Sequence, residues 1–146
     1  MNAKRSALVA VLGLVVLVAP VAADVVVLSD GSRLLGTVVR WSEGKITFET
    51  KFAGTLEIDT ELIVQIETDE PINVGVETGD RLVGPVRWQA NVNQVVVHTE
   101  LGDVPVAVDR VTDMWRLGEK SPEQLAAELD AKRIEEEFQK KLAKWS

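Results

Sequence analysis

Apolar and polar residues alternate over most of the chain between residues 24 and 116. This alternation is rich in β-branched residues and is interrupted by Gly, Asp, Asn and Ser, which predicts short strands joined by tight turns. The predicted strands cover residues 25–28, 33–41, 45–50, 55–58, 63–67, 72–77, 81–89, 94–99, 103–108 and 110–116. One helical turn is expected near residues 59–61.

The same pattern occurs twice in the sequence. SDGSRLLGTVVRW, which starts at Ser29, returns as ETGDRLVGPVRW, which starts at Glu77. Four residues of the first copy, Gly31, Arg33, Leu34 and Gly36, return 48 positions later as Gly79, Arg81, Leu82 and Gly84. A fixed period of this size indicates two copies of one folding unit. Each copy has five short strands with a long second strand, so we predict an all-β fold with two tandem SH3-like (Sm-like) small barrels plus a C-terminal α-helix. The predicted units are 24–70 and 71–118, and the helical segment is 119–146.

Several residues inside the long second strand predict irregular backbone. Gly36 and Gly84 fall in mid-strand, where glycine marks a bend or a close approach of another backbone. Pro85 removes a donor from the ladder, so the strand is expected to be an edge or to bulge there. Trp41 and Trp88 are 47 positions apart instead of 48, which predicts a β-bulge between the glycine and the tryptophan in one copy.

The last segment has the period of a helix instead of a strand. Ser121 is placed as an N-cap, with Pro122 at the first helical position and Gln124 near the capping-box position. One stripe at 100° per residue contains Ala127, Ala131, Ile134, Phe138, Leu142 and Trp145. Either the stripe packs on the chain's own barrels, or its far half meets another protein, a second copy or a membrane surface. In the second case Phe138, Leu142 and Trp145 are the partner-binding residues.

Residues 1–23 are predicted to be a signal peptide. Lys4 and Arg5 precede an uninterrupted apolar run over 7–19, and small residues at 21–23 favour cleavage before Asp24. A retained membrane anchor is the alternative, although the segment is barely as long as the roughly 20 residues that a spanning helix needs. The protein is therefore expected to be periplasmic or secreted, with membrane contact only through an uncleaved signal segment.

Charge and composition narrow the partners and the source of stability. Without Lys4 and Arg5, 14 basic residues remain against 23 acidic ones, a net charge near −9 that disfavours nucleic acid and anionic lipid as partners. The chain has no cysteine, so the core must hold the fold without disulfides. Each unit of about 47 residues is small for an independent domain. We therefore expect the two copies to pack together, or the helix to cover one of them.

The sequence predicts no catalytic, cofactor-binding or metal site. His98 is the only histidine, no serine stands in a nucleophile-elbow sequence, and no glycine-rich phosphate loop is present. Three pairs of carboxylates near turns could bind Ca²⁺ or act on a glycan. They are Asp59 with Glu61, Asp69 with Glu70, and Asp103 with Asp109. We expect these acids to be solvated turn caps.

The pattern VVVLSDGSRLLGTVVRW…ITFETKFAGTLEIDTELIVQI resembles the soluble N-terminal segment of a bacterial outer-membrane family. This family is often called salt-stress-induced outer-membrane proteins and has no settled biochemical activity. The matching residues are Leu28, Asp30, Gly31, Arg33, Leu34, Gly36, Thr50, Ala53, Gly54 and Ile58. The resemblance implies an envelope location and brings no catalytic residues. Members typically carry a transmembrane β-barrel after this segment, whereas nothing after Gly118 alternates over strands of about ten residues.

The first half of each copy is also similar to the opening motif of Sm-like proteins, which bind RNA. The similarity concerns backbone geometry, because the second motif with the RNA-contacting residues does not appear. Together these observations predict an exported non-catalytic binding or assembly module of the cell envelope, with a protein partner or self-association through the helix. The alternatives are an envelope glycan hydrolase that uses turn carboxylates and a Ca²⁺- or ligand-binding stress protein.

Overall fold

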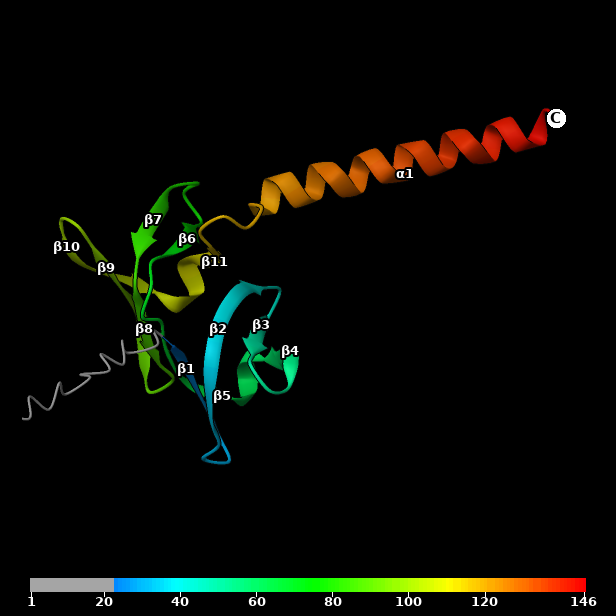
Figure 1. Cartoon of the computed structure of the whole chain (residues 1–146). Coiled ribbons are helices and arrows are strands. Elements are labelled where there is room, and N and C mark those ends of the chain that lie inside the picture. Colours follow the sequence, from blue (N-terminus) through cyan, green and yellow to red (C-terminus); the bar gives the residue numbers. More distant parts are fainter. Residues whose placement is uncertain (1–22) are drawn as a thin grey trace, which may run out of the picture.

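A computed structural model describes residues 23–146, so the predicted signal peptide lies outside the described residues except for Ala23. The described chain forms a strand-rich body from which one long helix projects (Figure 1). The first strands are β1 (Asp24–Leu28), β2 (Arg33–Ser42), β3 (Lys45–Thr50), β4 (Gly54–Asp59) and β5 (Ile63–Glu67). The later strands are β6 (Ile72–Val76), β7 (Arg81–Gly84), β8 (Val86–Gln89), β9 (Val92–Thr99), β10 (Gly102–Ala107) and β11 (Val111–Arg116). Short 3₁₀ turns η1 (Thr60–Leu62) and η2 (Val108–Arg110) precede β5 and β11, and the helix is α1 (Pro122–Lys144). The predicted β protein with a C-terminal helix is confirmed.

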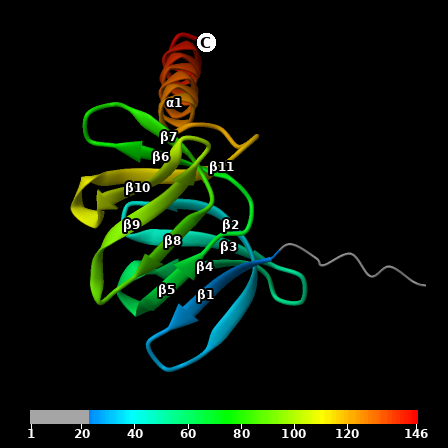
Figure 2. The same cartoon turned by 90° about the vertical axis from the view of Figure 1, so that its left-hand side faces the viewer.

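The strands form one curled antiparallel sheet (Figure 2). Its order is β10-β9-β8-β5-β1-β2-β11-β6-β7, and β3 and β4 continue from β2 off this path. Within each half, the first strand pairs with the second and the last: β1 pairs with β2 and β5, and β6 pairs with β7 and β11. Between the halves, β2 pairs with β11 and β5 pairs with β8. The last strand of each half therefore also pairs with the other half, β11 with β2 and β5 with β8, where β8 follows β7 in the segment that corresponds to β2.

Turn hydrogen bonds in the first half recur 48 residues later. The Gly31 N–H donates to the Leu28 carbonyl at 3.0 Å, and the Gly79 N–H donates to the Val76 carbonyl at 2.9 Å. Both glycines have a φ of +88°, which L side chains rarely adopt. The β1–β2 and β6–β7 turns thus have the same geometry for the same reason.

One apolar core serves both halves. Its buried residues form a single cluster. They are Val26, Val38, Ile46, Phe48, Ile58, Ile63, Ile66, Ile72, Val74, Val86, Val95, Val97 and Met114. The alternation along the strands directs these side chains inward. The two halves therefore pack together, as expected, and the strand pairs between them bring their inner faces to one interior.

The helix does not cover this core. No residue of α1 is buried, and every residue from 126 to 146 is exposed. The interpretation in which the apolar stripe packs on the chain's own strands is therefore wrong. The physical reason is that the two halves close the core against each other, so its burial does not depend on a covering helix.

Glycine in mid-strand serves close packing of two backbones. A Cβ atom on Gly36 would lie 2.2 Å from the Glu49 carbonyl oxygen, and one on Gly84 would lie 2.2 Å from the His98 carbonyl oxygen. The predicted close approach is confirmed in both copies. Pro85 separates β7 from β8, which interrupts the strand at the position where the ladder donor is missing.

The expected bulge lies in the first copy. The register between β2 and β3 shifts between Val38 and Arg40, so one additional residue fits between Gly36 and Trp41. This extra residue accounts for the spacing of 47 between Trp41 and Trp88. The two indole rings then meet across the junction of the halves, with centroids 5.9 Å apart at an interplanar angle of 49°.

Candidate interaction site on the C-terminal helix

Local hydrogen bonds determine where the helix begins. The Ser121 hydroxyl accepts from the Gln124 N–H at 3.3 Å, and the Gln124 side chain accepts from the Ser121 N–H at 2.9 Å. This capping box satisfies two backbone donors that a helix start leaves free. Just before it, the Lys120 carbonyl accepts from the Arg40 side chain on β2, and the Lys120 ammonium pairs with Glu128. The base of α1 is thereby attached to the sheet.

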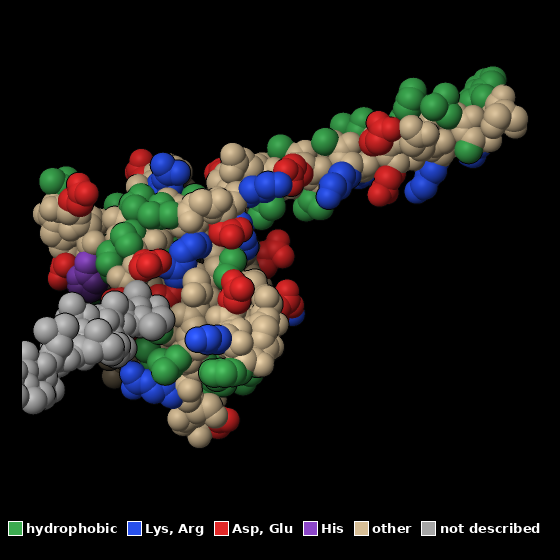
Figure 3. Space-filling model, viewed as in Figure 1, with side chains coloured by type: hydrophobic (Ala, Val, Ile, Leu, Met, Phe, Trp, Pro, Cys, Tyr) green, Lys and Arg blue, Asp and Glu red, His purple; other side chains and the backbone are tan. Residues whose placement is uncertain are grey.

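Beyond its base the helix extends away from the body into solvent (Figure 1). Of the three predicted partner-binding residues, Phe138 and Leu142 lie on its far half and Trp145 is the C-cap residue, with exposures of 55%, 49% and 90%. Their spacing of four and three residues places them on one side of the helix. Ile134, which is 64% exposed, continues the same stripe toward the base. Apolar side chains gather at the far end of α1 in Figure 3.

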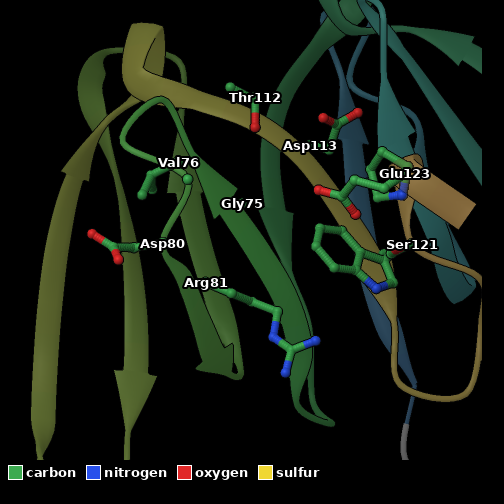
Figure 4. A pocket seen from close by; sticks show the side chains of 11 residues that line it. Gly75, Val76, Asp80, Arg81, Thr112, Asp113, Ser121 and Glu123 are labelled. Carbon is green, nitrogen blue, oxygen red and sulfur yellow. The ribbon is translucent and has the colours of Figure 1, made fainter.

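A small hollow of about 290 Å³ lies where α1 meets the sheet. Arg81 on β7 and Glu123 in the first turn of α1 line it, together with Trp115 of β11 (Figure 4). The Ser121 hydrogen bond, helped by the charge of Arg81, lowers the pKa of the Glu123 carboxyl. The opposite charges of Arg81 and Glu123 make this hollow polar where the base of α1 meets the sheet.

A larger hollow, of about 750 Å³, lies in the second half, between β7 and the β9–β10 hairpin. Its walls are mainly apolar, with Leu82, Val83 and Val104 among the lining residues. His98 is at this hollow, and its Nδ1 lies 2.6 Å from an Asp103 carboxylate oxygen. In the described part of the chain, no serine or cysteine lines the hollow. The pair orients the imidazole ring, and Arg81, Thr99 and Glu100 are the other polar residues that line the hollow.

The turn carboxylates do not gather into one site. Asp103 pairs with His98, and Glu70 lies 3.6 Å from Arg116. Asp59 ends β4 and Glu61 lies in η1, both exposed. Within residues 23–146 there is no group of three or more His, Cys, Asp or Glu side chains arranged to hold a metal ion. Each of these acids is thus placed by its own turn or its own ion pair.

The buried polar group at the start of the body was missed in the sequence. Asp24 is 2% exposed, and its carboxylate pairs with Arg116, whose side chain is 13% exposed. An acid that opens an otherwise apolar strand was the available signal, but its partner lies 92 residues away. The hollow beside His98 had no comparable signal, because its walls come from strands of separate hairpins.

Comparisons with known proteins do not indicate a functional site, so the candidate site is identified from its geometry. No family model, no curated protein and no solved structure matches the chain. Among residues 23–146, no helix combines the length and the apolar character that crossing a membrane requires. The far half of α1 is thus the described surface where exposed apolar groups form a continuous stripe, and it is our candidate interaction site.

Proposed function

We propose that this protein is an exported, non-catalytic binding or assembly module of the cell envelope that contacts its partner through the far half of α1. The observation behind this proposal is that the 23-residue helix has no buried residue and extends away from the body beyond its base. An amphipathic helix gains most of its stability by burying its apolar face in tertiary contacts. A helix that retains such a face without a tertiary contact is suited to meet a partner.

The apolar stripe supports contact better than scattered surface residues would. Single exposed apolar residues are ordinary on a protein surface. Here Ile134, Phe138, Leu142 and Trp145 follow one another along one side of one helix. Aromatic residues are also the side chains that most often anchor protein interfaces. Trp145, with 90% of its surface exposed, is the strongest single anchor.

We also propose that each half of the body is an SH3-like unit whose second strand is shared with the other half. The strand neighbours support this, since the first half runs β5-β1-β2-β3-β4 and the second runs β11-β6, then β7 and β8, then β9-β10. The bent second strand is continuous as β2 and divided at Pro85 in the second half. The 48-residue offset of the turns is a further support.

The envelope location rests on the sequence of residues 1–23 and on the resemblance to salt-stress-induced outer-membrane proteins. Both predict export, and cell fractionation with N-terminal sequencing tests it. We expect the protein outside the cytosol with Asp24 as its first residue. Recovery of the intact N-terminus in the cytosol would remove the envelope from the proposal.

A ligand-binding role is the second candidate. The hollow of about 750 Å³ beside His98 has mainly apolar walls with a few polar groups, as small-molecule sites commonly show, and Asp103 holds the His98 ring there. A thermal-shift screen with small apolar acids and amines tests it, because a ligand that binds only the folded state raises the melting temperature. The variant Val104→Arg, which would fill the hollow, should abolish any such shift.

An envelope pull-down tests the principal proposal. The bait is the processed chain, which starts at Asp24. It is compared with a triple variant, Phe138→Ala, Leu142→Ala, Trp145→Ala, and with a control variant, Leu129→Ala. Leu129 is 67% exposed on the same helix but lies outside the stripe. We expect a partner, or a second copy, to be retained by the processed chain and by the control and lost from the triple variant. Equal retention by all three baits would show that α1 is not the contact site.

A further inference from the structure

The two ends of α1 differ in charge. Residues 122–137 contain six acidic and two basic side chains, whereas residues 138–146 contain Lys140, Lys141 and Lys144 and no acid. The near part therefore has a net charge of about −4 and the far part about +3. All residues from 126 to 146 are exposed, so this charge difference faces solvent around the whole helix. A surface of this kind is complementary to a copy of itself turned end for end.

The two ends also differ in the size of their apolar residues. Along the stripe, Ala127 and Ala131 occupy the near part, and Phe138, Leu142 and Trp145 occupy the far part, with Ile134 between them. From Ala127 to Phe138 the residues follow steps of four, three and four, and Trp145 stands seven further on, which is the spacing of a coiled-coil seam. Lys141 holds the remaining seam position, with Leu142 beside it. Large residues at one end and small ones at the other are again complementary in reverse orientation.

We propose that α1 pairs with α1 of a second copy of this chain in an antiparallel coiled coil. This inference rests on the proposed function and names its partner. Aligning the seams end for end places Trp145 of one copy on Ala127 of the other, and Ile134 on Phe138. The same alignment brings Asp130 of each copy beside Lys144 of the other. From Ala127 to Trp145 the seam is about 27 Å long at 1.5 Å per residue.

A parallel copy or a membrane surface would match a smaller part of the helix surface than an antiparallel copy does. A parallel pair would place like charges side by side along its whole length and would put two lysines at position 141 into the seam. An anionic membrane would attract the basic far part with its aromatic residues. It would leave the acidic near part and its alanines without a role. Only the antiparallel copy matches both the charge and the size gradients.

Reciprocal charge reversal tests the pairing and its orientation. Lys144→Glu removes the attraction at both symmetric contacts of the dimer, and so does Asp130→Lys. The control Glu136→Lys makes a similar change of charge on the side of the helix opposite the seam. Sedimentation equilibrium over a concentration series gives the dimer dissociation constant of each processed chain. We expect it to rise about tenfold or more in either reversed variant and to stay within about threefold in the control.

Mixing the two reversed variants supplies the decisive comparison. In an antiparallel pair, the glutamate introduced at position 144 of one variant would meet the lysine introduced at position 130 of the other. The unchanged Asp130 and Lys144 would meet at the second contact. The equal mixture should therefore dimerise as well as the original chain.

Disulfide trapping reports the orientation directly. The original sequence has no cysteine, so each introduced cysteine can pair only with another introduced one. Ala127 and Trp145 face each other across an antiparallel seam, within the short span that a disulfide bridges. A mixture of Ala127→Cys and Trp145→Cys chains should therefore form the mixed disulfide, whereas either chain alone should not crosslink.

The outcomes separate this inference from the proposed function. A processed chain that stays monomeric, yet retains another envelope protein through the stripe, overturns the pairing and leaves the assembly role intact. Binding to vesicles of phosphatidylglycerol and phosphatidylethanolamine by a monomer overturns it as well. Self-crosslinking of the Ala127→Cys chain alone would indicate a parallel pair and would also overturn it. A monomer that retains neither protein nor vesicles contradicts both proposals.

Discussion

Asp24 and Arg116, at the two ends of the β body, form an ion pair although 92 residues separate them in the sequence. The Asp24 carboxylate also accepts from the Val38 N–H at 2.7 Å and from the Asp69 N–H at 3.0 Å. The Arg116 guanidinium donates through Nε to the Val38 carbonyl at 3.0 Å. The pair thus satisfies both backbone groups of Val38 and links the first described strand to the last.

At the other junction of the halves, between β5 and β8, a neutral side chain makes the equivalent hydrogen bonds to the backbone. Thr68 stands 48 residues before Arg116, and Val86 stands 48 residues after Val38. The Thr68 N–H donates to the Val86 carbonyl at 2.9 Å, and the Thr68 hydroxyl accepts from the Val86 N–H at 2.8 Å. Equivalent backbone positions are therefore satisfied by one threonine at one junction and by a buried ion pair at the other.

Removing one member of this ion pair should be costly. Asp24→Ala leaves Arg116 without its buried partner and two backbone N–H groups without acceptors. We expect the free energy of unfolding to fall by about 3–5 kcal/mol, the range for breaking a buried pair. Urea denaturation followed by tryptophan fluorescence measures it. The control is Asp30→Ala, an exposed acid that accepts from the Ser32 N–H in its own turn at 2.8 Å, and equal losses in the two variants would contradict this assignment.

The close approach at Gly36 makes a second prediction. In Gly36→Ala the new methyl group would overlap the Glu49 carbonyl, which is backbone and cannot rotate away. We expect a loss of about 3 kcal/mol or more from overpacking. Gly79→Ala is the matched control, since a Cβ there meets no atom within 4 Å and only the positive φ opposes it, at about 1–2 kcal/mol. A smaller loss at Gly36 than at Gly79 would show that β2 shifts freely.

Trp41 and Trp88 should be energetically coupled. Their rings lie 5.9 Å apart at a tilted angle, within the range in which aromatic pairs attract each other. A double-mutant cycle with Trp41→Leu and Trp88→Leu should give a coupling energy of about 0.5–1.5 kcal/mol. The same double-mutant cycle with Trp41→Leu and Trp115→Leu serves as the comparison. A coupling of zero between Trp41 and Trp88 would mean that the junction is held by the strand pairs alone.

Local features of the fold could be predicted because local sequence determines them. Alternation predicted the strands, a glycine in mid-strand predicted a bend or a close approach at Gly36 and Gly84, and an offset of 47 predicted a bulge in one of the two copies. The additional strand pairing between the two halves could not be predicted. The segments 63–67 and 111–116 each pair with one strand of their own half and one strand of the other, and their apolar period does not indicate the second partner.

The candidate site was predictable to the same extent. The helical period of 3.6 residues is enough to place Phe138, Leu142 and Trp145 on one side of a helix. It could not say whether that side meets the body, because amphipathicity describes a face and not its partner. The burial of Asp24 was hidden for a related reason: only the fold brings Arg116 to it.

Two carboxyl groups at the base of α1 should titrate low. The hydrogen bond from Ser121 lowers the pKa of Glu123, and the hydrogen bond and charge of Lys120 lower the pKa of Glu128. A pKa lower in the folded state means that each contact stabilises the helix base above the unfolded pKa and is lost as pH falls through the folded pKa. NMR titration of the side-chain carboxyl carbons should give midpoints for Glu123 and Glu128 below the ordinary value for glutamate. In Lys120→Ala the midpoint of Glu128 should return toward the ordinary value, while that of Glu123 stays low.

The body should be stable without its helix. No residue of α1 is buried, and the side chain of Leu125 is only half-buried at the helix base. A chain that ends at Gly118 therefore loses little apolar burial, and we expect its free energy of unfolding to stay within about 1 kcal/mol of the longer chain. Ile66→Ala, a change at a core residue 1% exposed, should cost about 2–5 kcal/mol and shows the size of a real core defect. A loss of that size on truncation would mean that α1 folds back on the sheet in solution, and the free stripe on which the assembly proposal depends would then be absent.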